Sequence, residues 1–197
     1  MEESPLGRKP DPARKPELLE RVIEYLCENG IGDLSLRPLA AALGLSTYAL
    51  VYHFGSKEGV LAAALGEVER RQRAMIATWV ESDPTPTTAE LLERYWNWCS
   101  AQANLPVMRL VIEATTLEAT RSGLPASLRA QLVSDWVDLL AQGFRADGLA
   151  AADARREATL ANAALIGLAL DLIATGDKRR TSAALRGLVA RLPDGSS

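Results

Sequence analysis

The chain has 197 residues, of which 48% are hydrophobic and 24% charged, and a formal net charge of −3. This length fits one domain or two small ones, with enough apolar residues for a sizeable core and a charge balance ordinary for a soluble protein. Two cysteines, Cys27 and Cys99, exclude a disulfide framework, and a single histidine, His53, excludes a multi-histidine metal site.

Targeting signals are not expected at either the start or the middle of the chain. Met1 is followed by Glu2 and Glu3, which does not resemble the basic and then apolar start of a signal peptide. The most apolar run, residues 163–170, ends at Asp171 and is shorter than the roughly 20 residues that cross a bilayer. We therefore expect a cytoplasmic protein with no membrane segment.

Residues 1–12 are expected to form a disordered arm, because they contain Pro5, Gly7, Pro10 and Pro12. The pair Arg8-Lys9 within this arm has two interpretations that the sequence leaves open. It is either simply solvated or it reaches into the minor groove of DNA, as the arms of some helix-turn-helix proteins do.

The first predicted helix starts near Pro16, which suits a first helical turn, and ends at Asn29-Gly30. Its apolar residues recur at helical spacing, so that one face is expected to be buried. This face consists of Leu18, Leu19, Val22, Ile23 and Leu26, with Cys27 as a small core residue.

Two short helices are predicted next, over residues 36–43 and 47–52. Ser35 and Ser46 have the short side-chain oxygen of a helix N-cap, and Gly44 can adopt the left-handed conformation that ends the first helix. Ala40 is expected where the two helices cross, and Leu50 is expected to hold the second against the first. Two such helices joined by a tight turn form a helix-turn-helix unit.

The second of these helices is the predicted reader of DNA, because its first residues would enter the major groove and its hydroxyls could bond phosphates. His53 at its end has an alternative role as a packing residue. Residues 1–60 hold seven Lys or Arg against nine Asp or Glu, so we expect few ionic contacts with DNA and a modest salt dependence. The candidate DNA-binding residues are Arg37, Ser46, Thr47, Tyr48, Tyr52, His53 and Lys57.

The run from Ser46 to Leu61 resembles the signature of TetR-type transcriptional repressors. The matching residues are Ser46, Ala49, Leu50, Tyr52, His53, Phe54, Lys57, Glu58 and Leu61. Tyr48 stands where the family usually has glycine, and Val51 where it usually has a phosphate-binding tyrosine. The resemblance spans about residues 14–65 and implies a helix-turn-helix domain over residues 13–62, followed by a helical effector-binding and dimerisation domain over residues 63–197.

The rest of the chain is predicted to be helical, giving an all-α protein of about nine helices. A long helix is expected over residues 56–80, and prolines at 84 and 86 break the chain after it. Five further helices are predicted over residues 88–103, 107–121, 125–146, 151–175 and 181–192. No segment shows the period-two alternation of a strand.

An aromatic cluster over residues 95–98 has two interpretations, ordinary core packing or the wall of a pocket for an apolar ligand. The family resemblance adds that such repressors commonly bind an effector in this domain. An acidic anchor such as Glu113 would favour a cationic effector. The candidate pocket residues are Trp96, Trp98, Met108, Ile112, Glu113, Thr116, Trp136, Leu140, Phe144 and Asn162.

Small residues near the C-terminal end indicate close helix packing, either inside one molecule or between two copies as a four-helix interface. We favour a homodimer, because one helix-turn-helix gains affinity from a two-fold partner on a two-fold operator. The candidate interface residues are Ala163, Ala164, Gly167, Leu168, Asp171, Ala184, Leu185 and Leu188.

Catalysis is poorly supported, since the sequence has no Gly-rich phosphate loop, no HExxH motif and no nucleophile elbow. We expect no metal and no cofactor. The function that fits best is a repressor released from double-stranded operator DNA by an unidentified small, largely apolar ligand. Two alternatives stay open: a DNA-binding regulator without an effector, and a helical binding or enzyme module in which the helix-turn-helix is only a scaffold.

Overall fold

The computed structural model describes residues 15–82, 86–120 and 126–192, and the arm expected over residues 1–12 lies outside them. Within these ranges the chain forms nine α-helices, one short 3₁₀ helix and no strand, which confirms the predicted all-α class. The helices are α1 (Lys15–Asn29), α2 (Leu36–Ala42), α3 (Thr47–Phe54), α4 (Lys57–Ser82), α5 (Thr88–Cys99), α6 (Leu105–Thr120), α7 (Ala126–Ala146), α8 (Ala151–Thr175) and α9 (Lys178–Val189), with the 3₁₀ turn η2 (Gln102–Asn104) before α6.

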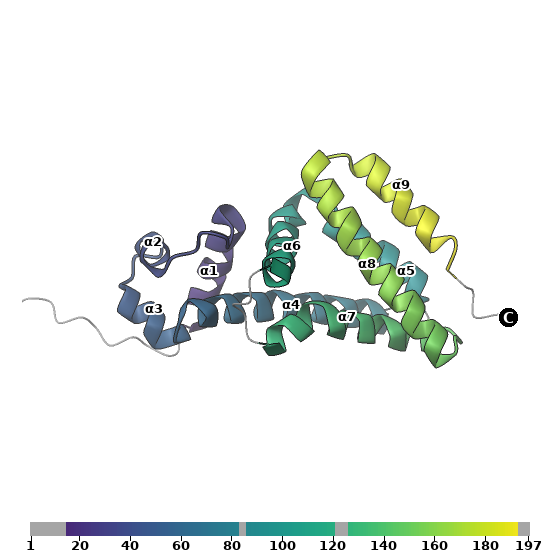
Figure 1. Cartoon of the computed structure of the whole chain (residues 1–197), viewed down its shortest axis with the longest axis horizontal. Coiled ribbons are helices and arrows are strands. Elements are labelled where there is room, and N and C mark those ends of the chain that lie inside the picture. Colours follow the sequence, from purple (N-terminus) through teal and green to yellow (C-terminus); the bar gives the residue numbers. More distant parts are fainter. Residues whose placement is uncertain (1–14, 83–85, 121–125, 193–197) are drawn as a thin grey trace, which may run out of the picture.

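The helices form two groups at opposite ends of the long helix α4 (Figure 1). Helices α1, α2 and α3 lie at one end, and α5, α7, α8 and α9 form a bundle at the other. Helix α6 stands between the groups and packs on α1, α7 and α8. Two helices, α4 and α6, therefore connect the N-terminal group to the bundle.

The core of the N-terminal group is built from apolar residues of α1 to α4, among them Val22, Leu39, Leu50 and Val60, which have no exposed surface. Leu110 and Ala114 of α6 complete the same cluster. Helix α4 runs without a break across residue 62, where the sequence places a domain boundary. The division into 13–62 and 63–197 stays a prediction.

The turns of the helix-turn-helix depend on local chemistry at three residues. Gly44 has φ +67°, a conformation that favours glycine, and it joins α2 to α3. Ser46 caps α3, and its hydroxyl accepts a hydrogen bond from Ala49 N at 3.2 Å. Ser35 also occupies an N-cap position, but its side chain makes no cap hydrogen bond, in contrast to the expectation from sequence.

Helix α4 begins close to the end of α3, and Gly59 makes this approach possible. A Cβ atom at residue 59 would lie 1.9 Å from the carbonyl oxygen of Phe54, which is a severe clash with backbone. The Ser56 hydroxyl accepts from Gly59 N at 3.1 Å and caps the first turn of α4. These contacts fix the direction in which α4 leaves the helix-turn-helix.

Helix α8 is the most apolar helix of the bundle and packs against α6, α7 and α9. It has the length and composition of a membrane-spanning helix, with a mean hydropathy of 1.7 over its most apolar 18 residues. Only 28% of that segment is buried. This is weak evidence for a membrane, because core helices of soluble proteins have the same composition, but it shows that α8 exposes an unusually apolar surface.

Candidate DNA-binding surface and ligand cavity

Helix α3 presents an exposed outer face at the end of the molecule. Tyr48 is 71% exposed and Tyr52 is 53% exposed, and Ser46 and Thr47 are exposed beside them. Leu50, on the opposite side, is fully buried and anchors the helix to the core. The expected reading face is therefore largely exposed and is available to a partner.

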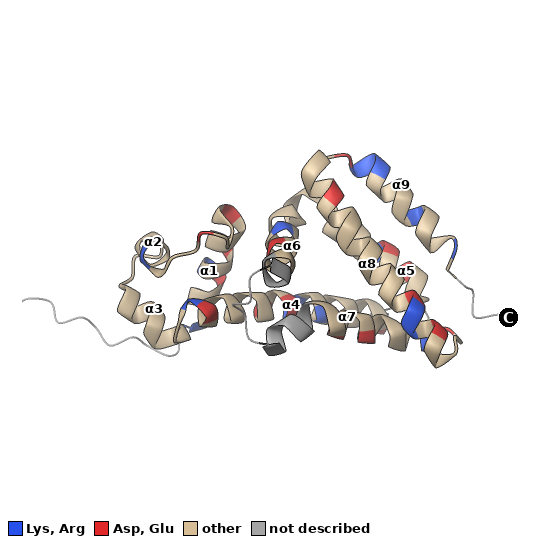
Figure 2. Ribbon diagram, in the orientation of Figure 1, with Lys and Arg blue, Asp and Glu red and all other residues tan. Residues whose placement is uncertain are grey.

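This face is uncharged. Helix α3 contains no Lys, Arg, Asp or Glu and is tan along its whole length in Figure 2. Of the predicted basic contacts, Arg37 is exposed on α2 and Lys57 is half-buried at the start of α4, so both flank α3. Polar groups for phosphates or bases on α3 itself come from hydroxyls and from one imidazole.

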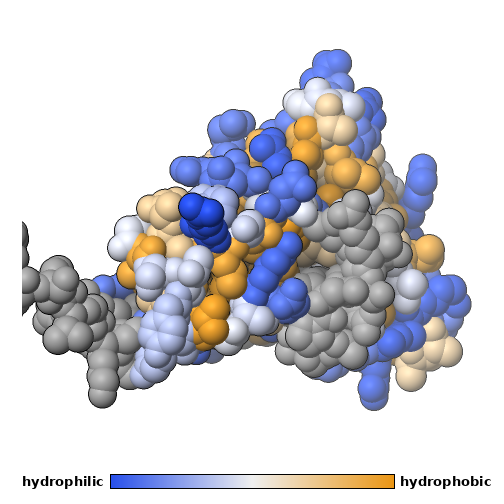
Figure 3. Space-filling model, turned by 60° about the vertical axis from the view of Figure 1, so that its left-hand side comes forward, coloured by the Kyte–Doolittle hydropathy of each residue, from blue (hydrophilic) through white to orange (hydrophobic). Residues whose placement is uncertain are grey.

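Figure 3 shows the hydropathy of the residues at this end of the molecule. Hydrophobic and weakly polar residues lie among the hydrophilic ones there. Val51, which replaces the tyrosine usual in the family signature, is 42% exposed, and Leu45 at the turn is 36% exposed. Aliphatic groups of this kind could contact thymine methyl groups but not phosphates.

His53 lies at the edge of the surface and has a packing role. Its ring is half-buried, and it meets the Tyr52 ring edge-on with ring centres 5.3 Å apart and the Phe54 ring at 6.3 Å. The Lys15 ammonium lies 5.7 Å from the centre of the Phe54 ring and ties the start of α1 to the end of α3. His53 is thus positioned by its neighbours at the border between core and surface.

The bundle contains a cavity of about 320 Å³ between α4, α5, α6, α7 and α8. Its wall is almost entirely apolar, and this volume lies at the small end of the range for organic ligands. Six of the residues expected from sequence lie in the wall, namely Trp96, Met108, Ile112, Trp136, Leu140 and Asn162.

The other four expected pocket residues do not line the cavity. Trp98 stacks on Tyr95 outside the wall, with ring centres 6.0 Å apart. Phe144 is 2% exposed and fills the apolar cluster under α8. The Thr116 hydroxyl donates to the carbonyl of Ile112, and Glu113 points toward the N-terminal group.

Glu113 therefore corrects the expectation of an acidic ligand anchor. Its Oε1 accepts hydrogen bonds from the backbone N–H groups of Ile31 at 3.0 Å and Gly32 at 2.8 Å, in the α1–α2 loop. A Cβ atom at residue 30 would lie 2.9 Å from Glu113 Oε2, so the absence of a side chain at Gly30 leaves room for the carboxylate. The carboxylate joins the two ends of the molecule instead of facing the cavity.

Helix α6 therefore packs against the N-terminal core with one face and lines the cavity with another. Leu110 and Ala114 belong to the core of the N-terminal group, whereas Met108 and Ile112 line the cavity. Glu113 adds two hydrogen bonds to the first of these contacts. Helix α6 thus contacts both the cavity and the base of the helix-turn-helix.

Several wall residues were not expected from the sequence. Helix α4 contributes Gln72, Ile76 and Val80, which recur every four residues along one side of the helix. Thr88 lines the cavity from the start of α5, and its hydroxyl is buried without a hydrogen-bond partner among the described residues. The spacing of residues 72, 76 and 80 was the sequence signal that could have identified the α4 face.

The ionisable groups in the wall are kept neutral by burial. Burial raises the pKa of the Cys99 thiol to about 12. It also raises the pKa of the Tyr95 phenol well above its usual value, with a further contribution from Cys99. Both shifts mark the cavity as a poorly hydrated place in which charge is disfavoured.

The exposed apolar surface of α8 forms one stripe along the helix. Leu160 is 54% and Leu170 47% exposed, and Ala163 and Gly167 lie exposed between them. A Cβ at Gly167 would meet nothing within 4 Å. Of the other expected interface residues, Ala184 is exposed, and Ala164, Leu168 and Leu188 are half-buried.

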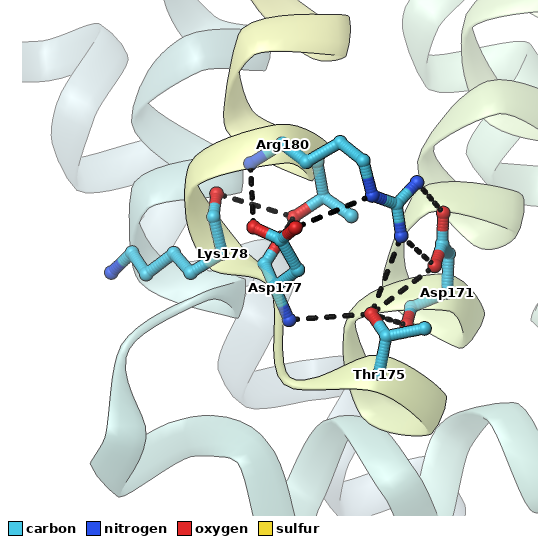
Figure 4. A network of polar contacts seen from close by, with 6 residues as sticks. Asp171, Thr175, Asp177, Lys178 and Arg180 are labelled. Atoms are coloured by element: carbon cyan, nitrogen blue, oxygen red, sulfur yellow. Dashed lines mark hydrogen bonds and ion pairs between the residues drawn. The ribbon is translucent and has the colours of Figure 1, made fainter.

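Two of the expected interface residues are engaged within the chain. Leu185 is 1% exposed and packs in the cluster around Trp96, because α9 turns this side chain toward α5. Asp171 accepts two hydrogen bonds from the Arg180 guanidinium, at 2.6 and 2.7 Å (Figure 4). This pairing lowers the pKa of Asp171 and holds the α8–α9 turn closed.

A metal centre is not apparent in the described ranges. No group of three or more His, Cys, Asp or Glu side chains in them could hold a metal ion.

Comparison with known proteins places the chain among bacterial regulators. The sequence model of the bacterial regulatory proteins, tetR family, matches residues 18–64. The chain is 30% identical over 183 residues to the HTH-type transcriptional regulator BetI of Pseudomonas aeruginosa PAO1, an alignment that covers 88% of each protein. It is 34% identical over 87 residues to the HTH-type transcriptional regulatory protein RaaS of Mycobacterium tuberculosis, covering 44% of this chain and 41% of that protein.

Solved structures share the fold at low sequence identity. A TetR-family regulator from Agrobacterium tumefaciens matches with a TM-score of 0.73 at 20% identity, covering 92% of this chain and 99% of the other. A transcriptional regulator from Saccharomonospora viridis, solved in complex with choline, matches with a TM-score of 0.73 at 16% identity, covering 92% and 97%.

Proposed function

Because the chain belongs to the TetR family of DNA-binding transcriptional regulators, we propose that it is a cytoplasmic, homodimeric repressor whose hold on operator DNA is released by a small, largely apolar ligand. Members of this family are regulators and not enzymes, so the scaffold alternative is set aside. The Saccharomonospora viridis complex with choline is a precedent for a small organic ligand on this fold.

The observation that carries the proposal is the double role of α6. One face of this helix lines the cavity through Met108 and Ile112, and another completes the core beneath the helix-turn-helix through Leu110 and Ala114. Helix α4 has the same property along its length, with Val60 in the N-terminal core and Ile76 in the cavity wall. A ligand in the cavity touches both helices that lead to the DNA-binding end.

The mechanism follows from two states of a dimer. In one state the two α3 helices fit successive major grooves, about 34 Å apart, and in the other they do not. A ligand shifts this equilibrium only as far as its affinity for the two states differs. We propose that the ligand-bound cavity favours positions of α4 and α6 that misplace α3, and that Glu113 transmits the motion of α6 to the α1–α2 loop.

DNA contacts are assigned to Arg37, Ser46, Thr47, Tyr48, Tyr52, His53 and Lys57. The exposure of Tyr48 and Tyr52 and the position of Thr47 at the N-terminus of α3 support this assignment. The dimer is assigned to the exposed stripe of α8 together with α9, because exposed apolar side chains such as Leu160 and Leu170 along one helix face favour a partner.

A regulator without an effector is the alternative, and the cavity argues against it. A bundle whose aromatic residues merely filled the core would leave no such space, whereas about 320 Å³ stays open here. A regulator without an effector would be supported if no compound altered the stability of the protein or its DNA binding.

The proposal is tested by selecting bound sequences from random DNA duplexes with the full-length protein. We expect a two-fold symmetric site and a discrete mobility-shifted complex that survives competitor DNA. The same complex then serves to screen compounds for release. A folded protein that enriches no sequence would contradict the DNA-binding assignment, and a selected site that no cavity-binding compound releases would contradict the ligand response.

A further inference from the structure

The wall of the cavity carries no full charge. The described residues that line it include no Asp, Glu, Lys, Arg or His. The polar groups that remain are amides, hydroxyls, two indole N–H groups, one phenol and one thiol. A charged ligand would lose its hydration on entry and find no counter-charge in this wall, which is a large penalty in an apolar site.

An aromatic cage for a cation is not open either. Tyr95 stacks against Trp98, with ring centres 6.0 Å apart, and lies 5.6 Å from Trp136. The Arg73 guanidinium lies 5.3 Å from the centre of the Trp136 ring. The faces of these rings are thus occupied by one another or by a positive charge, which disfavours a second cation.

Arg73 does not supply a positive charge for an anionic ligand, because two carboxylates lie beside it. Its Nε donates to Glu69 Oε1 at 2.9 Å. Its Nη2 is buried without a hydrogen-bond partner among the described residues, but it lies 3.8 Å from Asp135 Oδ2, which balances its charge. One positive and two negative charges therefore gather outside the wall, and Arg73 itself is not among the lining residues. This group offers no net positive field to a carboxylate or phosphate.

One unpaired and one weakly paired hydrogen-bonding group lie at separate places along the cavity. Thr88 is 3% exposed, and its hydroxyl has no partner in the described ranges. Gln72 is 4% exposed, and the hydrogen bond of its amide nitrogen is the weak one to Met108 Sδ at 3.9 Å. Buried polar groups in native proteins normally have partners, so the unpaired Thr88 hydroxyl points to a ligand that supplies one. The Gln72 amide, whose bond to sulfur is weak, can exchange that bond for a stronger one to a ligand oxygen.

The cavity is also long. Lining residues run from Gln72 to Val80 on α4, a rise of about 12 Å, and from Thr88 to Cys99 on α5, a rise of about 16 Å. Thr88 lies beyond the end of α4 that carries Val80, whereas Gln72 lies two turns before Val80. The Thr88 hydroxyl and the Gln72 amide are therefore separated along the length of the cavity.

We propose that the effector is an uncharged, elongated, largely hydrocarbon molecule with a neutral hydrogen-bonding group at each end, one end at Thr88 and the other at Gln72. This inference rests on the proposed function and adds the class of ligand. It excludes quaternary ammonium compounds and ionised fatty acids as the preferred occupants of the cavity.

The test compares probes of one chain length that differ in charge: decanediol with a hydroxyl at each end, decanol, decanoate and decyltrimethylammonium. Binding to the full-length protein is measured without DNA, by calorimetry and by intrinsic tryptophan fluorescence, below micelle-forming concentrations. We expect the diol to bind about tenfold or more tighter than either ionic probe. Equal or tighter binding of an ionic probe, or failure of the diol to bind, overturns the proposal.

A matched pair of variants tests the end assigned to Thr88. Thr88→Val removes the unpaired hydroxyl with little change of shape and is expected to weaken the diol about five- to tenfold. Thr115→Val is the control, because Thr115 also lines the cavity but its hydroxyl already donates to Val111 O at 2.9 Å. Equal losses in both variants contradict the assignment of this end.

Release from a selected operator is measured in parallel. A diol that binds tightly but leaves DNA affinity unchanged upholds the ligand class and contradicts the ligand response. A diol that fails to bind a protein that still recognises its operator contradicts the ligand class alone.

Discussion

Replacing Glu113 by alanine tests whether the cavity and the DNA-binding end communicate through α6. The substitution removes the acceptor of two backbone N–H groups, Ile31 and Gly32, in a region that is only partly buried. Hydrogen bonds to a charged group contribute about 1.5–3 kcal/mol when buried, so we expect roughly 1–2 kcal/mol for this partly exposed pair. That energy corresponds to a factor of about 5–30 in the equilibrium between docked and undocked loop.

The magnitude is comparable with the coupling energies of about 1–3 kcal/mol that link effector and ligand sites in allosteric proteins. Glu113→Ala should therefore keep the fold and bind the same cavity ligand, while the change in operator affinity caused by that ligand becomes several-fold smaller. The ligand effect on operator affinity in Glu113→Gln should lie between those of the unchanged protein and Glu113→Ala. Both hydrogen bonds end on a single oxygen, and a carboxamide oxygen can accept them without the charge.

Hydrogen exchange gives the direct readout. The amides of Ile31 and Gly32 should exchange up to about 30-fold faster in Glu113→Ala, while amides in the core of α1 keep their protection. Glu28→Ala, which removes an exposed carboxylate on α1, is the control for charge alone. Unchanged protection of both loop amides, together with an undiminished ligand effect on DNA binding, would refute the role assigned to Glu113.

Three further predictions concern the DNA surface, the dimer and the cysteines. Tyr48→Ala should fold normally, since Tyr48 is 71% exposed, and should weaken binding to a selected operator by about 1–3 kcal/mol in a mobility-shift titration; full-strength binding would remove Tyr48 from the interface. Gly167→Trp should give a folded monomer by light scattering, while Gly66→Trp, whose glycine also faces open space, stays dimeric; a dimeric Gly167→Trp protein would contradict the assigned face. At mildly alkaline pH iodoacetamide should modify Cys27 before Cys99, because only the thiolate reacts. Burial, Glu28 and Glu24 raise the pKa of Cys27, but the deeper burial of Cys99 raises its pKa to about 12; equal rates by mass spectrometry would show that Cys99 is open to solvent.

The helix-turn-helix could be predicted because its determinants are local. Gly44 and Ser46 act on the residues next to them, and Leu50 belongs to a periodic pattern that the structure preserves. The helical class followed from the same periodicity. These features need only the geometry of one chain segment, which the sequence contains.

The pocket could be predicted only in part, because a helix in the middle of a protein has more than one buried side. Ile112 and Glu113 are neighbours in sequence but point about 100° apart, so they could not both face one cavity. Which side of α6 meets the cavity depends on where α1 packs, and the sequence of α6 does not contain that information. Trp98 and Phe144 were misplaced for the same reason, because they face neighbouring side chains and not the empty space.

The uncharged outer face of α3 bears on how the regulator is distributed in a cell. Attraction to DNA of any sequence comes almost wholly from cations neutralising phosphates, and such attraction normally holds most copies of a regulator on the chromosome at random sites. If α3 reads DNA as proposed, with hydroxyls, aromatic rings and a few flanking cations, we expect a larger fraction of the copies to stay free. Few molecules per cell would then be enough to fill an operator, and a small amount of effector would be enough to empty it.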